Sequence, residues 1–191
     1  MSLTPSLYRA RVDIAAIDTA EDAQALRAVA ESYRCDTRLV PVGCPAHLVE
    51  VLAGAASTAE ILILAAHGDE RGFLLPELAP QIAAEQPFNG ALTPQLVRRH
   101  ARLPGRLVIS VGCYTGSPAM AGAFLARGAR AYIGPRSAPN GEAAVAFVAA
   151  LLYAHLVREL ALPAAVDNAR ELVADDGEWR LYEAGPPGSH R

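Results

Sequence analysis

Ile61-Leu-Ile-Leu-Ala-Ala66 leads directly into His67-Gly68-Asp69, and Arg106-Leu-Val-Ile-Ser-Val-Gly112 leads directly into Cys113-Tyr-Thr-Gly116. Both apolar runs have the length and the β-branched content of strands that are buried on both faces of a sheet. Parallel α/β sheets open into a ligand-binding crevice at the carboxyl ends of their strands. The two runs therefore predict strands that deliver an imidazole and a thiol to that crevice.

Strand-like and helix-like runs alternate along the rest of the chain. Thr93-Pro94 and Ser117-Pro118 each combine an N-cap residue with a proline at the first helical position. We expect further strands at residues 12–17, 37–42, 129–133 and 178–183, and helices at residues 20–33, 45–52, 94–100, 119–127, 141–160 and 163–173. This alternation is typical of parallel βαβ units and predicts a three-layer α/β/α sandwich with a mostly parallel sheet.

Some segments are expected outside this alternation. Residues 72–78 read as a short β-ribbon, and residues 79–90 as a loop that decorates the crevice. Pro41 suggests that its strand lies near a sheet edge. At 191 residues the chain predicts one domain, residues 1–184, with a disordered tail at residues 185–191.

The composition argues against several classes of partner. The chain is 52% hydrophobic with a formal net charge of −3. Most of its Lys and Arg residues are scattered along the chain. The one dense cluster, Arg98, Arg99, Arg102 and Arg106, is explained by a solvated helix end. Because a phosphate-binding surface needs clustered positive charge, we expect no nucleic-acid or membrane partner. Neither a glycine-rich nucleotide loop nor metal-ligand spacing of His and Cys is present, so we expect no cofactor and no metal.

The three cysteines, Cys35, Cys44 and Cys113, leave at least one thiol free and form no CxxC pair. This usage favours a reduced, cytoplasmic setting. The first residues lack the basic and apolar regions of a secretory signal. The apolar stretch at residues 143–157 falls short of the roughly 20 residues that span a bilayer. The Ala- and Arg-rich composition suggests a bacterial origin.

Cys113 and His67 offer the two groups that thiol catalysis needs. A cysteine attacks an acyl carbon as thiolate, so it needs a nearby base and an environment that stabilises negative sulfur. The helix beginning at Pro118 would point its positive dipole end towards the Cys113 sulfur. The N–H groups of Gly68 and Cys113 would form an oxyanion hole.

Each of these residues also has an ordinary structural interpretation. A lone histidine is more often solvent-facing, and a lone cysteine is more often a small buried apolar residue. Cys35 and Cys44 are expected to be structural. The combination of His67 and Cys113, each at a strand end with glycine beside it, favours a paired site.

The pattern resembles the caspase-like (clan CD) cysteine peptidases. In that family an apolar strand ends in His-Gly, a second ends in a small residue and Cys, and about 50 residues separate the two. Residues 107–134 are most similar to the CHAT branch, which is related to separase, because they contain a Cys-x-x-Gly turn, a helix, a Gly-Ala corner and a strand. The segment Trp179-Arg-Leu-Tyr-Glu-Ala-Gly185 is similar to the aromatic strand that closes CHAT domains. The Gln-Ala-Cys-x-Gly signature of animal caspases is absent, so activity on Asp bonds is not implied.

The resemblance implies a caspase-like fold and a cysteine endopeptidase, with Cys113 as nucleophile and His67 as general base. Family members select a charged residue before the scissile bond. Asp18 is placed like the acidic pocket residue of metacaspases and favours Arg or Lys, although Asp18 also reads as a helix cap. Arg136 favours an acidic residue, or solvates its loop. Because Asp69 and its neighbour Glu70 add negative charge near the crevice, we expect a basic residue before the scissile bond.

Two alternatives remain open. In the first, the domain has kept the fold and serves as a catalytically silent adaptor or protein-interaction domain, since fold does not imply function. Alternatively it is a zymogen whose crevice forms after cleavage or on binding a regulatory protein partner, with residues 69–90 and 135–141 as the segments that move. The natural substrate and the oligomeric state are not indicated by the sequence.

Overall fold

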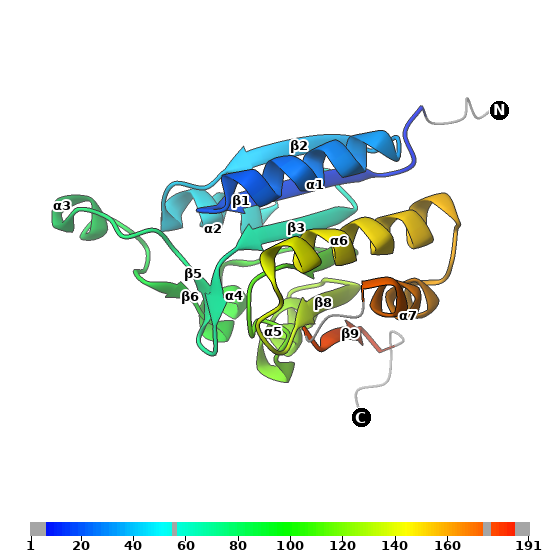
Figure 1. Cartoon of the computed structure of the whole chain (residues 1–191). Coiled ribbons are helices and arrows are strands. Elements are labelled where there is room, and N and C mark those ends of the chain that lie inside the picture. Colours follow the sequence, from blue (N-terminus) through cyan, green and yellow to red (C-terminus); the bar gives the residue numbers. More distant parts are fainter. Residues whose placement is uncertain (1–6, 55–56, 174–176, 186–191) are drawn as a thin grey trace, which may run out of the picture.

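The computed structural model describes residues 7–54, 57–173 and 177–185, and its centre is a six-stranded sheet with the order β2-β1-β3-β7-β8-β9 (Figure 1). The strands are β1 (Arg11–Ile17), β2 (Asp36–Pro41), β3 (Ile61–Ala66), β7 (Leu107–Ser110), β8 (Ala131–Pro135) and β9 (Trp179–Glu183). All neighbouring pairs are parallel except β8 and β9. β2 lies at an edge, as Pro41 suggests.

Helices cover both faces of the sheet, so the prediction of a three-layer α/β/α sandwich with a mostly parallel sheet is confirmed. One core joins the sheet to α1 (Ala20–Ser32), α6 (Gly141–Leu152) and α7 (Leu162–Val173). The other joins it to α2 (Pro45–Ala53), α4 (Pro94–His100) and α5 (Pro118–Ala126). Alternate residues of each strand point to opposite faces, which is why Ile14 belongs to the first core and Ala15 to the second.

β3 lies between β1 and β7 in the middle of the sheet. All six of its residues are buried, and it pairs with β1 on one side and β7 on the other. A strand covered on both faces needs apolar residues throughout, which explains its unbroken apolar sequence. The carboxyl ends of β1, β3 and β7 therefore lie next to one another.

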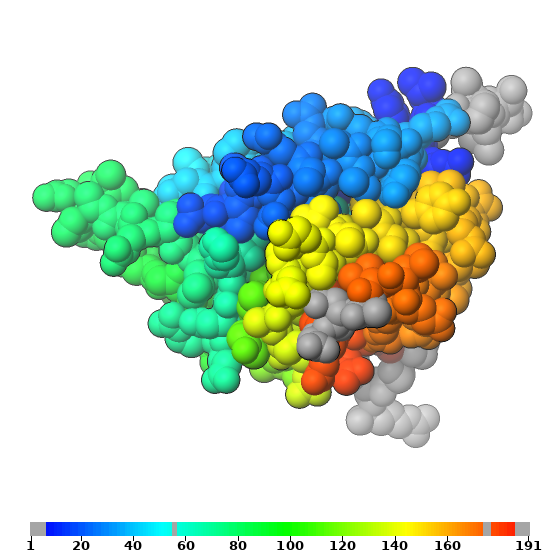
Figure 2. All heavy atoms as spheres, in the orientation of Figure 1, coloured from blue at the N-terminus to red at the C-terminus, as the bar shows by residue number. Residues whose placement is uncertain are grey.

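A small three-stranded sheet extends from the carboxyl end of β3. It consists of β4 (Gly68–Asp69), β5 (Gly72–Leu74) and β6 (Ala91–Leu92), all antiparallel. Residues 75–90, which we call the arm, connect β5 to β6 and contain the short helix α3 (Pro80–Ala83). A ribbon was expected at residues 72–78, but only residues 72–74 of that range form a strand, and its partners β4 and β6 and the helix α3 were not expected. The arm projects away from the body of the molecule (Figure 2).

Several boundaries differ from the expectation. Thr19, not Asp18, stands at the N-cap position of α1 and makes no side-chain capping bond, so the assignment of Asp18 as a helix cap was wrong. Asp18 instead turns the chain with a φ of 56°. The α-helical part of the segment 141–160 ends at Leu152 and continues as a π-helical turn, η1 (Tyr153–Val157).

Pro163 lies inside the first turn of α7 rather than before it, a position that needs no backbone N–H. Thr93 and Ser117 do cap α4 and α5, because their hydroxyls accept from Leu96 N and Met120 N. The predicted disordered tail falls mostly on residues 186–191, outside the described residues. No helix in the described ranges has both the length and the apolar character needed to cross a membrane.

Candidate active site

The sheet order places the strand ends that lead to His67 and Cys113 side by side. β3 pairs with β7, with Leu64 opposite Ser110, so His67 and Cys113 follow adjacent strands at the same edge. β7 itself ends at Ser110, two residues before the end of the apolar run at Gly112, and Cys113 lies in the turn that follows. On the other side of β3, the pairing of Ile17 with Ala66 places Asp18 beside His67.

The two segments approach so closely that only glycine fits between them. A Cβ atom on Gly68 would lie 2.5 Å from the Cys113 carbonyl oxygen and 3.1 Å from the Cys113 amide nitrogen. A Cβ atom on Gly112 would lie 3.2 Å from the Ala66 carbonyl oxygen. The backbone after His67 is therefore in direct contact with the backbone that carries the thiol.

A buried hydroxyl pair holds the Cys113 turn from inside. Ser110 Oγ and Thr115 Oγ1 lie 2.5 Å apart, and both side chains are fully buried. Thr115 Oγ1 donates to the Gly112 carbonyl at 2.7 Å, and Gly112 N donates to Ser110 Oγ at 3.1 Å. These bonds connect Ser110, Gly112 and Thr115 into one buried hydrogen-bonded ring. Cys113 lies in the loop between Gly112 and Thr115 and is half-buried.

Two tyrosines from the neighbouring strands hold the far side of the same turn. Tyr132 on β8 donates its hydroxyl to the Thr115 carbonyl at 2.9 Å, and Tyr182 on β9 donates to the Gly116 carbonyl at 2.8 Å. Burial raises the pKa of the Tyr132 hydroxyl, more than its hydrogen bonds to Thr115 and Ser110 lower it, so Tyr132 stays a donor at any physiological pH. The Cys113 turn is thus anchored on two strands besides its own.

Tyr114, directly after the thiol, has a φ of 61°, a left-handed conformation that bulky residues rarely adopt. Its N–H donates to the Ser137 carbonyl at 3.0 Å, and its side chain is exposed. Such conformations persist only where the surroundings impose them, and they cluster at functional sites. The bond to Ser137 and the buried ring around Thr115 supply that constraint here.

His67 is held far more loosely. Its carbonyl accepts from Leu74 N at 3.0 Å, but its side chain is exposed. Within the described residues, no hydrogen bond joins its ring to the Cys113 thiol or to another group. In an antiparallel pair, hydrogen-bonded and non-hydrogen-bonded residue pairs alternate along the strands. His67 is hydrogen-bonded to Leu74, so the next residue, Gly68, directs its N–H away from β5.

Asp18 lies in the same hollow as His67. The hollow has a volume of about 230 Å³ and is lined by Asp18, Thr19, Ala20, Glu21, Asp22 and His67. Three residues with carboxylate side chains, Asp18, Glu21 and Asp22, therefore line the same hollow as His67. Glu21 and Asp22 were not singled out from the sequence, although their place in the first turn of the helix after β1 could have indicated them.

The other two predicted substrate contacts are placed differently. The carboxylate of Asp69 accepts from Arg71 N at 2.8 Å and from Arg71 Nε at 2.9 Å in the turn between β4 and β5, and this bonding lowers its pKa. Arg136 follows β8, its N–H bonds the Gly177 carbonyl at 3.0 Å, and its side chain is exposed. The structure brings Asp18 and His67 into one hollow but does not bring Asp69 or Arg136 into it.

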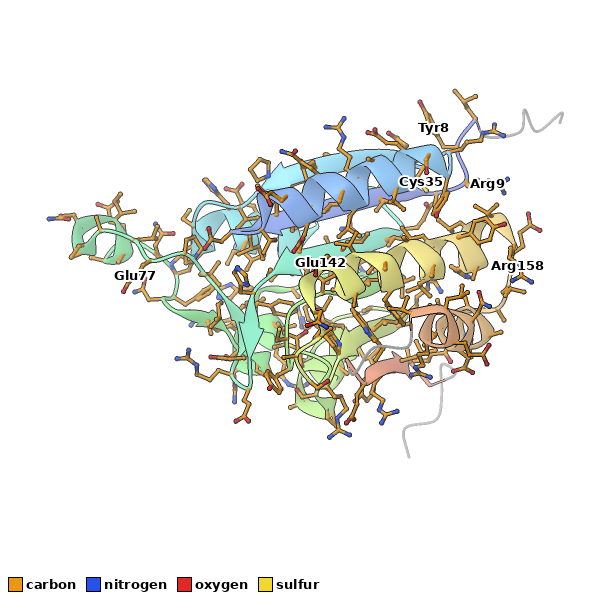
Figure 3. All side chains as sticks on the ribbon, in the orientation of Figure 1. Tyr8, Arg9, Cys35, Glu77, Glu142 and Arg158 are labelled. Atoms are coloured by element: carbon orange, nitrogen blue, oxygen red, sulfur yellow. The ribbon has the colours of Figure 1, made fainter. Side chains whose placement is uncertain are left out.

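The remaining cysteines lie elsewhere. Cys35 is buried at the far end of α1, away from the arm that carries Glu77 (Figure 3), and burial raises the pKa of its thiol to about 11. Cys44 is half-buried at the N-cap of α2. No group of three His, Cys, Asp or Glu residues that could hold a metal ion occurs in the part of the chain described.

Sequence reasoning missed the residues that support the Cys113 turn. Ser110, Thr115, Tyr132 and Tyr182 form this support. A signal was available, because Ser110 is a polar residue in an otherwise apolar strand, and a buried hydroxyl needs a partner. The partners themselves depend on which strands neighbour β7, which the sequence does not reveal.

A comparison with protein-family models finds no match, and neither does a search of curated proteins. Solved structures do match. The chain is similar to the Saccharomyces cerevisiae separase in its complex with securin, with a TM-score of 0.58 and 10% identity over 95% of this chain and 12% of that one. It is similar to the Arg-specific cysteine proteinase gingipain R, with a TM-score of 0.59 and 13% identity over 93% of this chain and 46% of that one.

A secreted C11 cysteine protease from Bacteroides thetaiotaomicron matches with a TM-score of 0.50 and 15% identity, over 87% of this chain and 59% of that one. The chain thus spans less than two thirds of the length of each of these proteins. At these identities the likeness shows the fold, which is that of caspase-like cysteine proteases.

Proposed function

We propose that the protein is a cysteine endopeptidase in which Cys113 is the nucleophile and His67 the general base. The observation that carries the proposal is the contact between the Gly68 backbone and the Cys113 backbone, at the carboxyl ends of two adjacent parallel strands. A fold shared with several cysteine proteases supports it. The similarity of residues 107–134 to the CHAT branch belongs to the same proposal.

The proposed reaction passes through a thioester. His67 takes the thiol proton as Cys113 sulfur attacks the peptide carbonyl carbon, and the N–H groups of Gly68 and Cys113 stabilise the oxyanion. The imidazolium then gives its proton to the leaving amine as the C–N bond breaks. Water, deprotonated by His67, hydrolyses the thioester and restores the thiol. The exposed His67 ring is free to turn towards the sulfur when substrate excludes water, because hydrogen bonds in apo sites are often formed only then.

We further propose that the enzyme cleaves after a basic residue. Asp18, Glu21 and Asp22 line the hollow beside His67, which favours Arg or Lys over Asp or Glu. Asp69 contributes less than the sequence suggests, because Arg71 already neutralises it. Arg136, on the opposite side of the Cys113 turn, is the residue that would favour an acidic substrate.

Peptidyl acyloxymethyl ketones with Arg, Lys, Asp or Asn next to the warhead test the proposal. We expect the Arg and Lys probes to add one inhibitor mass to the intact protein, and the label to map to Cys113. Cys113→Ala should abolish labelling, while the matched change at another half-buried thiol, Cys44→Ala, should leave it intact. Failure of all four probes to label a protein whose thiols titrate as free would refute the proposal.

One observation favours a second candidate, a catalytically silent domain that binds a protein partner. Among the described residues the His67 ring makes no hydrogen bond to the Cys113 thiol. A silent domain would react with iodoacetamide at Cys113 no faster than at Cys44, and His67→Ala would not change that rate. An active dyad would make Cys113 the faster thiol and would make its rate depend on His67.

A further inference from the structure

A second hollow opens beside the one that contains His67. It has a volume of about 360 Å³, within the range of about 300–1,000 Å³ that is usual for ligand pockets. Its lining is mostly aliphatic and consists of Ala16, Asp18, Ala20, Gln24, Leu39, Pro41, Val42 and Gly43. We call it the β2 hollow, because half of these residues come from β2 and the turn that follows it.

The two hollows share a wall. Asp18 and Ala20 line both of them, so the β2 hollow adjoins the hollow beside His67, and Cys113 lines neither of the two. The pairing of Ile17 with Ala66 sets the first hollow over β3 and β1, and the pairing of Ala16 with Pro41 sets the second over β1 and β2. Neighbouring strands lie about 4.8 Å apart, and an extended peptide advances about 3.3 Å per residue. Side chains one or two residues apart would therefore reach the two hollows.

The walls of the hollows differ in polarity. Three acidic residues line the hollow beside His67, whereas the β2 hollow has only Asp18 on the shared wall and Gln24 as its other polar residue. A charged side chain there would find one carboxylate at most, Asp18 on the shared wall, whereas an apolar one would be removed from water by the aliphatic lining. The occupant that fits both hollows together is a peptide with a basic residue and a nearby apolar one.

We propose that the β2 hollow is a substrate subsite that accepts an apolar side chain one or two residues from the basic residue held beside His67. This inference rests on the proposed peptidase function. The inference means that the enzyme recognises two residues of the substrate, one basic and one apolar, rather than one.

Gly43 gives a direct way to block the hollow. Gly43 lines the hollow, and a Cβ atom there would meet only His47 Nδ1, at 3.9 Å, so a side chain can begin at this position without moving the backbone. Gly141 offers a matched control, because nothing lies within 4 Å of a Cβ atom added to it. Gln24 lies on the exposed side of α1, where a lysine is well tolerated by the helix.

The test uses fluorogenic peptides that contain one Arg flanked by Gly, and a set in which Leu replaces Gly one or two positions away on either side. We expect Leu at one of these positions to raise kcat/KM about tenfold. Gly43→Leu should reduce this ratio to about threefold or less, and Gly141→Leu should preserve it. Gln24→Lys should lower the preference for Leu and raise that for Glu at the same position.

The outcomes separate the two proposals. If no Arg peptide is cleaved and no ketone probe labels Cys113, the peptidase function itself fails. If the Arg peptides are cleaved but Leu at none of the four positions improves kcat/KM, the subsite is overturned. A Leu preference that survives both Gly43→Leu and Gln24→Lys places the apolar subsite elsewhere and overturns it as well.

Discussion

The turn that carries Cys113 and the strand end that carries His67 lie in contact, yet they are built in opposite ways. The Cys113 turn is tied by Ser110, Thr115, Tyr132 and Tyr182 to three strands of the sheet. His67 leads into a narrow ribbon, and its ring is exposed and without a hydrogen-bond partner in the described ranges. One side of the crevice is fixed before substrate arrives, whereas the other has freedom to adjust.

This difference fits the tasks proposed for the two residues. A nucleophile and an oxyanion donor act through precise placement, and misplacement by about 1 Å costs about 100-fold in rate. A general base must receive a proton and then deliver it to two different atoms, so a mobile ring is an advantage. Mutations on the two sides should therefore separate activity from stability.

His67→Ala should have the largest effect on activity and almost none on stability. Loss of the general base should reduce kcat/KM about 10³-fold. The free energy of unfolding should change by less than about 0.5 kcal/mol, because the side chain is exposed. Peptide cleavage and urea unfolding measure the two quantities, with His47→Ala on α2 as the control histidine. A variant that keeps more than a tenth of the activity would remove His67 from the mechanism.

Gly68→Ala tests the contact between the two sides. The added methyl group would lie 2.5 Å from the Cys113 carbonyl oxygen, so the backbones must separate. We expect the rate of Cys113 labelling by an Arg ketone to fall about 100-fold and the free energy of unfolding to fall by about 1–3 kcal/mol. Gly141→Ala, in open space, should change neither. Labelling of Gly68→Ala at the wild-type rate would show that the approach of the two segments is not needed for reaction.

Thr115→Val should act mainly on stability, because it removes a hydroxyl from the rigid side only. Ser110 Oγ and the Gly112 carbonyl would each lose a buried partner, at a cost of about 1–3 kcal/mol. Thr115→Ser keeps the hydroxyl and serves as the control. Cys113 labelling should slow by about tenfold in the valine variant, a tenth of the effect at Gly68. Equal unfolding midpoints for the valine and serine variants would contradict a structural role for the hydroxyl.

The same contrast decides what the sequence could predict. The unbroken apolar character of residues 61–66 indicated a central buried strand, and the adjacency of the His67-Gly68 and Cys113 segments could be predicted because parallel strands end at one edge. The support of the Cys113 turn could not, because Tyr182 reaches Gly116 only through the antiparallel return of β9 beside β8. Asp69 was expected to contact substrate, but its carboxylate forms an ion pair with Arg71, two residues later in the chain.

Asp69→Asn should have the smallest effect and a distinct pH dependence. Bonding to Arg71 lowers the pKa of Asp69 in the folded protein, so its contribution to stability is complete above its ordinary pKa of about 3.9 and is lost as the pH falls through the lower folded value. Urea midpoints should therefore differ slightly between wild type and variant at pH 7 and converge in acid once the pH falls below the lowered pKa of Asp69, with activity on Arg peptides retained. A gap that persists in acid would mean that the charge of Asp69 is not what stabilises the ribbon. A strong loss of Arg-peptide cleavage would instead return Asp69 to the substrate site, on the adjustable side of the crevice.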